Sequence, residues 1–147
     1  MALIVLDASV SLAWCFEDES TDEIRRLFGR LSIGDRAIVP AHWPIEVSNA
    51  LLLAQRRNRI SAALRRQYWD QFSDLLLTVD PALTMSDMNR VLELLEKDSF
   101  EEISERHGLT TYDGAYVDLA LRQAAGLASL DVSMSRAAKA EGIALLV

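Results

Sequence analysis

The segment Ala2-Leu3-Ile4-Val5-Leu6-Asp7-Ala8-Ser9 decides the fold class of this chain. Its residues 2–6 are all apolar, which is typical of a strand buried on both faces of a parallel sheet. Asp7 follows at the carboxyl end of this strand, where open α/β sheets bind their ligands. Ser9 is expected to be the N-cap of a helix over about residues 10–16. A simple turn or capping role is the alternative for Asp7.

The rest of the chain alternates short apolar strands with amphipathic helices. Further strands are expected at 37–39, near residue 79, at 127–130 and at 143–147. Helices are expected at 24–31, 45–56, 61–77, 86–96, 100–107, 113–124 and 133–140. This alternation predicts a parallel α/β sandwich with helices on both faces of a short sheet.

Length, composition and charge narrow the function classes. The 147 residues suit one domain over 1–147, and the net charge of -7 argues against binding nucleic acid through the overall field. A polyanionic ligand would therefore have to be bound through metal ions or through a local cluster of basic residues. The densest such patch contains Arg56, Arg57, Arg59, Arg65 and Arg66.

No apolar run approaches the roughly 18 residues of a membrane span, and Asp7 interrupts the first run before it could act as a signal sequence. A cytoplasmic protein is therefore expected. The one cysteine, Cys15, is expected to be buried rather than reactive. His42 and His107 are isolated from each other, so a surface or core role is expected for each, and the sequence offers no zinc-type ligand group.

Four acids share an expected position in this fold. Asp7 and Asp131 each follow a short apolar strand, and Glu46 and Asp113 each stand near the start of a helix. Parallel connections bring strand ends and helix starts to one edge of the sheet, so the four carboxylates are expected to converge. A hard divalent cation, Mg²⁺ or Mn²⁺, would relieve their repulsion. Each acid taken alone could instead be a helix cap or a turn residue.

Three polar residues near these acids are candidates for hydrogen bonds that orient the carboxylates. They are Ser9, Asn49 and Ser129, for which a purely structural role is the alternative. Asp118 lies five residues after Asp113, off the same helical face, and is expected to be exposed to solvent.

At these positions the chain resembles the PIN-domain ribonucleases, and among them the VapC toxins of bacterial toxin–antitoxin pairs. The resemblance rests on Val5-Leu6-Asp7-Ala8-Ser9-Val10, Glu46-Val47-Ser48-Asn49, Leu109-Thr110-Thr111-Tyr112-Asp113-Gly114-Ala115-Tyr116 and Leu127-Ala128-Ser129-Leu130-Asp131. It implies a PIN-like three-layer sandwich, a Mg²⁺-dependent endoribonuclease, a homodimer, and a cognate VapB-type antitoxin that blocks the site. The chain departs from the family in having Ser129 where threonine is common, Gly114 where alanine is common, and a longer segment over about 86–107.

The expected reaction is hydrolysis of an RNA phosphodiester bond. A metal held by Asp7 and Asp113, with Glu46 and Asp131 completing the acidic ring, would lower the pKa of a water, and the same ion or a second one would stabilise the leaving oxygen. The expected products carry a 5′-phosphate and a 3′-hydroxyl.

Two other functions are weighed against this one. Phosphoryl transfer through an aspartyl phosphate needs a second acid close to the nucleophilic aspartate and a well-placed lysine. It fits poorly, because Asp7 is followed by Ala8 and Ser9 and the only lysines of the chain are Lys97 and Lys139. A catalytically inactive binding module with the same fold and dimer is the other alternative, and the presence of all four acids weighs against it.

Overall fold

A computed structural model describes residues 1–81 and 99–147 of the chain. In this part, four parallel strands form one sheet in the order β3-β2-β1-β4. The strands are β1 (Leu3–Leu6), β2 (Arg36–Val39), β3 (Leu77–Val79) and β4 (Gly126–Ala128). The prediction of a parallel sheet with the first strand inside it is confirmed.

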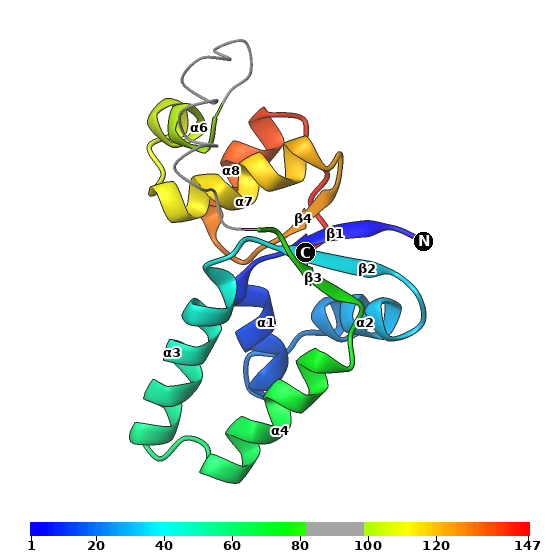
Figure 1. Cartoon of the computed structure of the whole chain (residues 1–147), viewed down its shortest axis with the longest axis vertical. Coiled ribbons are helices and arrows are strands. Elements are labelled where there is room, and N and C mark those ends of the chain that lie inside the picture. The colour runs from blue at the N-terminus through cyan, green and yellow to red at the C-terminus, as the bar shows by residue number, and fades with distance from the viewer. Residues whose placement is uncertain (82–98) are drawn as a thin grey trace.

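Helices cover both faces of the sheet. Those described are α1 (Ala8–Cys15), α2 (Asp22–Ser32), α3 (Trp43–Arg56), α4 (Ala62–Ser73), α6 (Phe100–His107), α7 (Thr111–Arg122) and α8 (Val132–Ala140). Figure 1 shows α1 to α4 on one side of the sheet and α6 to α8 on the other. This confirms the three-layer sandwich, and none of these helices is long and apolar enough to cross a membrane. The helix predicted over 86–96 lies outside the described residues.

Strand β1 lies inside the sheet and in the hydrophobic core. Its residues Ile4, Val5 and Leu6 are completely buried, and each contributes about 1.5–3 kcal/mol of hydrophobic stabilisation. Strands β2 and β4 pair with it on either side. The Asp7 amide extends the pairing by donating to the Ala128 carbonyl at 3.0 Å. Asp7 therefore leaves the sheet from a backbone position that is held in place.

The start of α1 differs from its prediction. The N-cap is Asp7, whose backbone is extended at φ -75° and ψ 150°, and Ser9 is already the second helical residue. Ser9 cannot cap a helix from inside it, because an N-cap must have non-helical backbone angles. Its hydroxyl is therefore available for other partners.

Two other element boundaries also differ from their predictions. The helix that Ser61 caps ends at Ser73 rather than near residue 77, since residues 77–79 pair with β2. The strand predicted over 143–147 is reduced to one parallel bridge between Leu127 and Leu145.

Candidate active site

Asp7 is the most enclosed acid of the candidate site. Its residue is 5% exposed, and its Oδ2 accepts hydrogen bonds from the hydroxyls of Ser9 at 2.5 Å and Ser129 at 2.8 Å. It occupies the N-cap position of α1 but makes no side-chain capping bond to that helix. The carboxylate is thus held by two serines from different segments rather than used to begin a helix.

Burial also changes the acidity of Asp7. Removal from water raises the pKa of its carboxyl above the ordinary value of 3.8, and the two serine hydroxyls oppose this shift without cancelling it. Acids with perturbed pKa values cluster at functional sites. The buried Asp7 at the end of β1 is therefore a candidate for such a site.

The same two serines connect the ends of β1 and β4. The Ser9 hydroxyl accepts from the Leu130 amide at 3.0 Å, and the Ser129 hydroxyl accepts from the Asp131 amide at 3.0 Å. Each serine therefore donates to Asp7 and accepts from the loop that follows β4. Ser129 therefore connects the backbone amide of Asp131 to the Asp7 carboxylate.

Glu46 is held by a tyrosine that sequence reasoning did not single out. The completely buried Tyr116 donates its hydroxyl to Glu46 Oε2 at 2.5 Å, and His42 Nε2 lies 3.7 Å from the same oxygen. Burial raises the pKa of Tyr116, and the bond to Glu46 and the charge of Asp7 raise it further. Because Tyr116 follows Asp113 by three residues, one helical turn, the helix pattern could have identified it.

Asp113 and Asp131 also take part in the hydrogen bonds at the starts of α7 and α8. Asp113 Oδ2 accepts from the Thr110 hydroxyl at 2.8 Å, and Thr110 is the N-cap of α7. Asp131 is the N-cap of α8, with Oδ1 accepting from the Met134 amide at 2.7 Å. The capping role that was the alternative for Asp131 is therefore present in the structure.

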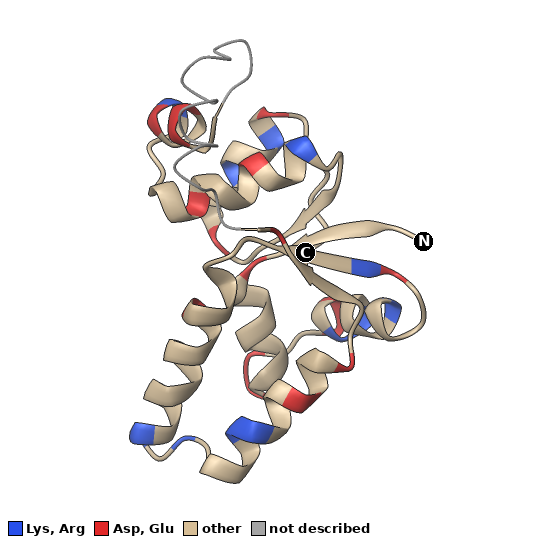
Figure 2. Cartoon of the chain, viewed as in Figure 1, with Lys and Arg blue, Asp and Glu red and all other residues tan. Residues whose placement is uncertain are grey.

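All four acids lie at the carboxyl edge of the sheet. Asp7 and Asp131 follow β1 and β4, and Glu46 and Asp113 lie in the first turns of α3 and α7. Figure 2 shows red segments where these helices begin and where β1 ends. Tyr116 bonds to Glu46, whereas Ser9 and Ser129 bond to Asp7, and within the described residues no hydrogen bond joins one of the four acids to another. As placed, no three His, Cys, Asp or Glu side chains within 1–81 and 99–147 form a metal-binding group.

The candidate orienting residue Asn49 lies about one helical turn after Glu46 on α3. It lines a surface cavity between α3 and α4 with Ile45, Leu52 and Trp69, and Glu46 is not part of that lining. Within the described residues, Asn49 makes no hydrogen bond to any of the four acids.

Asp118 was expected to be exposed, and this expectation is wrong. The residue is 9% exposed, and its carboxylate is paired with a neighbouring side chain of the same helix. Its Oδ2 accepts from Arg122 Nε at 2.7 Å, and a second nitrogen of Arg122 donates to Asp80 Oδ2 at 2.9 Å. Burial raises the pKa of Asp118 although the Arg122 guanidinium opposes this.

The remaining sequence-based expectations concern single side chains. Cys15 is buried as expected, and burial raises the pKa of its thiol to about 12. His107 has a structural partner, since its Nε2 lies 2.6 Å from Glu141 Oε1 and joins α6 to the end of α8. His42 also has a carboxylate neighbour, since its Nε2 lies 3.7 Å from Glu46 Oε2.

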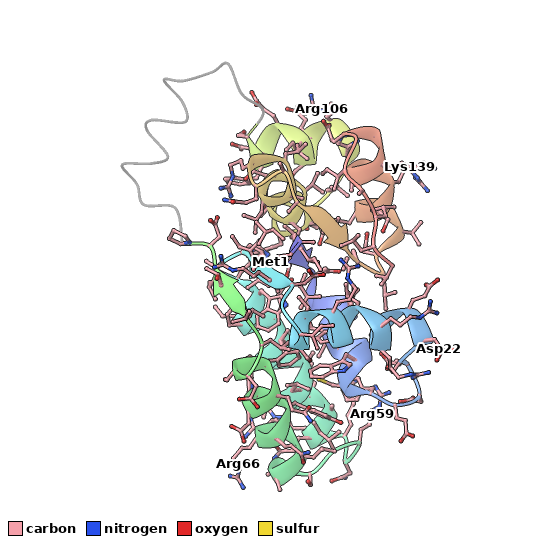
Figure 3. The ribbon with its side chains drawn as sticks, turned by 90° about the vertical axis from the view of Figure 1, so that its right-hand side faces the viewer. Met1, Asp22, Arg59, Arg66, Arg106 and Lys139 are labelled. Atoms are coloured by element: carbon pink, nitrogen blue, oxygen red, sulfur yellow. The ribbon has the colours of Figure 1, made fainter. Side chains whose placement is uncertain are left out.

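The basic patch lies at the far end of α3 from the acids. Arg56, Arg57 and Arg66 are exposed there and are called the α3–α4 arginines below. Glu46 and Arg56 are ten residues apart on one helix, which is about 15 Å. Figures 2 and 3 show basic residues at this end, with Arg66 at the opposite end of the molecule from Arg106.

Arg59 differs from its neighbours in this patch. One of its terminal nitrogens lies 2.7 Å from both Asp18 and Glu19, and its guanidinium stands 3.9 Å from the centre of the Phe16 ring. Its charge is therefore largely compensated within the chain.

Comparisons with known proteins agree with this architecture. A protein-family model of the PIN domain matches residues 4–140. The chain is similar to a solved structure, the crystal structure of PAE2754 from Pyrobaculum aerophilum, with a TM-score of 0.65 and 20% identity over 99% of this chain and 84% of that chain. At that identity the likeness shows the fold alone, and no curated protein matches the chain. Since the family match contains β2, β3, β4, α1 and all four acids of the sheet edge, this chain belongs to the PIN domain family.

Proposed function

We propose that this chain is a metal-dependent endoribonuclease that hydrolyses RNA phosphodiester bonds. PIN domains are generally nucleases, which supports a hydrolase acting on nucleic acid. The observation that carries the proposal is the Asp7 carboxylate, buried at the end of the central strand and held by two serine hydroxyls. A cation beside a buried carboxylate stabilises its charged form, and Asp7 makes no ion pair with Lys or Arg in the described part of the chain.

The residues at the sheet edge fit a hard divalent ion. Asp7, Glu46, Asp113 and Asp131 offer only oxygen donors, which suit Mg²⁺, with Mn²⁺ as a substitute. Within the described residues, no hydrogen bond reaches Glu46 Oε1, Asp113 Oδ1 or Asp131 Oδ2, so these oxygens are available. When bound, such an ion lowers the pKa of the attacking water and neutralises charge on the phosphate.

The protein's own contribution is to hold these oxygens in place. Ser9 and Ser129 fix the orientation of the Asp7 carboxylate, and Tyr116 fixes that of Glu46. Orientation by such supporting hydrogen bonds is what gives a carboxylate site its affinity for metal. We also propose Asn49 as an orienting residue, which would form its hydrogen bond to a carboxylate of the site only when the metal is bound. The expected products carry a 5′-phosphate and a 3′-hydroxyl.

The biological setting proposed for this nuclease follows from its resemblance to VapC toxins. We propose that the chain is the toxic component of a toxin–antitoxin pair, acts in the cytoplasm as a homodimer, and folds as a single PIN domain over 1–147. A VapB-type antitoxin would then block the acidic edge.

Cleavage by matched variants tests the nuclease proposal. The purified chain is incubated with Mg²⁺ and mixed structured RNAs, beside Asp7→Asn and the control Asp22→Asn, which replaces an exposed acid of α2. Wild type and Asp22→Asn are expected to cleave, and Asp7→Asn is not. EDTA is expected to stop cleavage, and Mn²⁺ to restore it.

The other outcomes separate the alternatives. Equal cleavage by wild type and Asp7→Asn would identify a contaminant and refute the assignment. Folded proteins that bind RNA without cutting it would indicate an inactive binding module. An acid-labile phosphate trapped on Asp7 would indicate transfer through an aspartyl phosphate.

A further inference from the structure

A half-open cavity of about 270 Å³ lies beside the acidic edge. It is formed where the start of α7 faces the chain that leaves β2 and β3, and Pro40, His42, Pro81 and Tyr112 belong to its lining. Tyr112 precedes Asp113 in the chain, and His42 lies 3.7 Å from Glu46. The cavity and the candidate site therefore share two of their supporting segments.

One wall of the cavity is aromatic. Tyr112 is 63% exposed, and its ring packs against the edge of His42 with centroids 5.4 Å apart and an interplanar angle of 64°. His42 in turn packs against the buried ring of Tyr116 at 5.2 Å. Tyr112 is thus supported from inside while most of its surface is open. A supported and exposed aromatic ring is a surface on which a nucleic-acid base can stack.

A second part of the lining is polar and already ordered. Arg122 is held between Asp118 at 2.7 Å and Asp80 at 2.9 Å, and all three residues line the cavity. The guanidinium supplies donors and the carboxylates supply acceptors, so a ligand with both kinds of group along one edge can bind there.

The size and chemistry of the cavity fit one particular ligand. Drug-sized ligands fill pockets of roughly 300–1,000 Å³, so a cavity just below that range takes a smaller group. A single unpaired RNA base is flat and carries donors and acceptors on its edge. Proteins recognise such bases by stacking them on aromatic rings and bonding their edges.

We propose that this cavity binds one unpaired base of the RNA substrate, stacked on Tyr112 and contacted at its edge by Arg122 and Asp80. The inference rests on the proposed nuclease function and defines its substrate as single-stranded RNA. The phosphate of the nucleotide bound here would lie at the neighbouring acidic edge. The cavity would therefore determine which phosphodiester bond of the RNA lies next to Asp7 and Asp113.

Abasic nucleotides test this inference by removing one base at a time. The full chain carrying Asp7→Asn, in the presence of Mg²⁺, is titrated against a short unstructured fluorescent RNA and against versions of it with one abasic position each. Loss of one stacked base is expected to weaken binding about 5- to 150-fold at one position of the RNA, with smaller effects elsewhere.

Variants of Tyr112 supply the matched control. Tyr112→Ala is expected to weaken binding of the intact RNA by a similar factor and to remove the sensitivity to that abasic position. Tyr112→Phe keeps the ring and is expected to keep the position-specific loss. Because Tyr112 is exposed, thermal unfolding is expected to show both variants folded.

The result that overturns the inference is distinct from failure of the nuclease proposal. A flat abasic profile, a position-specific loss that survives Tyr112→Ala, or no RNA binding at all overturns the base-binding cavity. Cleavage by the wild type, measured in parallel, reports the nuclease function separately. Cleavage with a flat profile refutes the cavity alone, and a position-specific loss without cleavage refutes the nuclease alone.

Discussion

Replacing Gly114 with alanine tests how closely α6 and α7 pack behind the acidic edge. A Cβ atom at this position would lie 1.9 Å from Ser104 Oγ, 2.7 Å from the Phe100 carbonyl oxygen and 3.2 Å from Ser104 Cβ. Favourable contacts between carbon atoms need about 3.5–4.0 Å. The alanine common at this place in the resembling family therefore does not fit here unless α6 moves.

The cost can be worked out from these contacts. Ser104 is 4% exposed and its hydroxyl is placed to donate to the carbonyls of Phe100 at 2.5 Å and Thr110 at 3.2 Å, so rotating it away disturbs partly buried hydrogen bonds. The Phe100 oxygen belongs to the backbone and can be relieved only by a shift of α6. Overpacking costs about 1–3 kcal/mol, and the helix propensity of alanine returns up to about 1 kcal/mol. Because main chain must move, we take the upper cost and expect a net loss of about 2 kcal/mol.

The assay is thermal and urea unfolding followed by circular dichroism. For a chain of this length, 2 kcal/mol corresponds to a fall in Tm of about 4–8 °C. The control is Gly29→Ala in α2, where nothing lies within 4 Å of the added Cβ, and a gain of up to about 1 kcal/mol is expected. If both substitutions stabilised the protein equally, the close approach of α6 and α7 would be refuted.

Three further predictions concern the acidic edge and the basic patch. Burial raises the folded-state pKa of Asp7 above 3.8, so the folded protein binds this proton more tightly and loses stability as pH rises from 3.8 through that pKa. Asp7→Asn is therefore expected to unfold at a higher temperature than wild type at pH 7, with the difference shrinking below pH 3.8, and added Mg²⁺ is expected to raise the Tm of wild type only. Tyr116→Phe removes the hydrogen bond to Glu46, and such a bond contributes up to about 1.5–3 kcal/mol to stability, so we expect the free energy of unfolding to fall by up to that amount and Mg²⁺ affinity to weaken, whereas Tyr68→Phe should not change Mg²⁺ affinity. Replacing the α3–α4 arginines with glutamine should flatten the plot of log affinity for RNA against log salt concentration by about 0.7 per lost phosphate contact, and an unchanged slope would exclude them from RNA binding.

The amino-acid sequence by itself determined the parallel sheet and the edge at which its acids gather. An apolar run ending in Asp7 specifies a buried central strand, and β1 is that strand, paired on both sides. Strand ends and helix starts are local features of sequence. Since parallel topology brings all of them to one edge, the shared location of Glu46, Asp113 and Asp131 could also be predicted.

Only the tertiary structure decided which side chains touch at that edge. The bond from Tyr116 to Glu46 joins residues 70 positions apart, and the bond from Ser129 to Asp7 joins residues 122 positions apart. The pairing of Arg122, the partner of Asp118, with Asp80 likewise joins residues 42 positions apart. Such contacts depend on the distance and angle at which whole elements pack, and these follow from the volumes of all the side chains between them rather than from any local pattern.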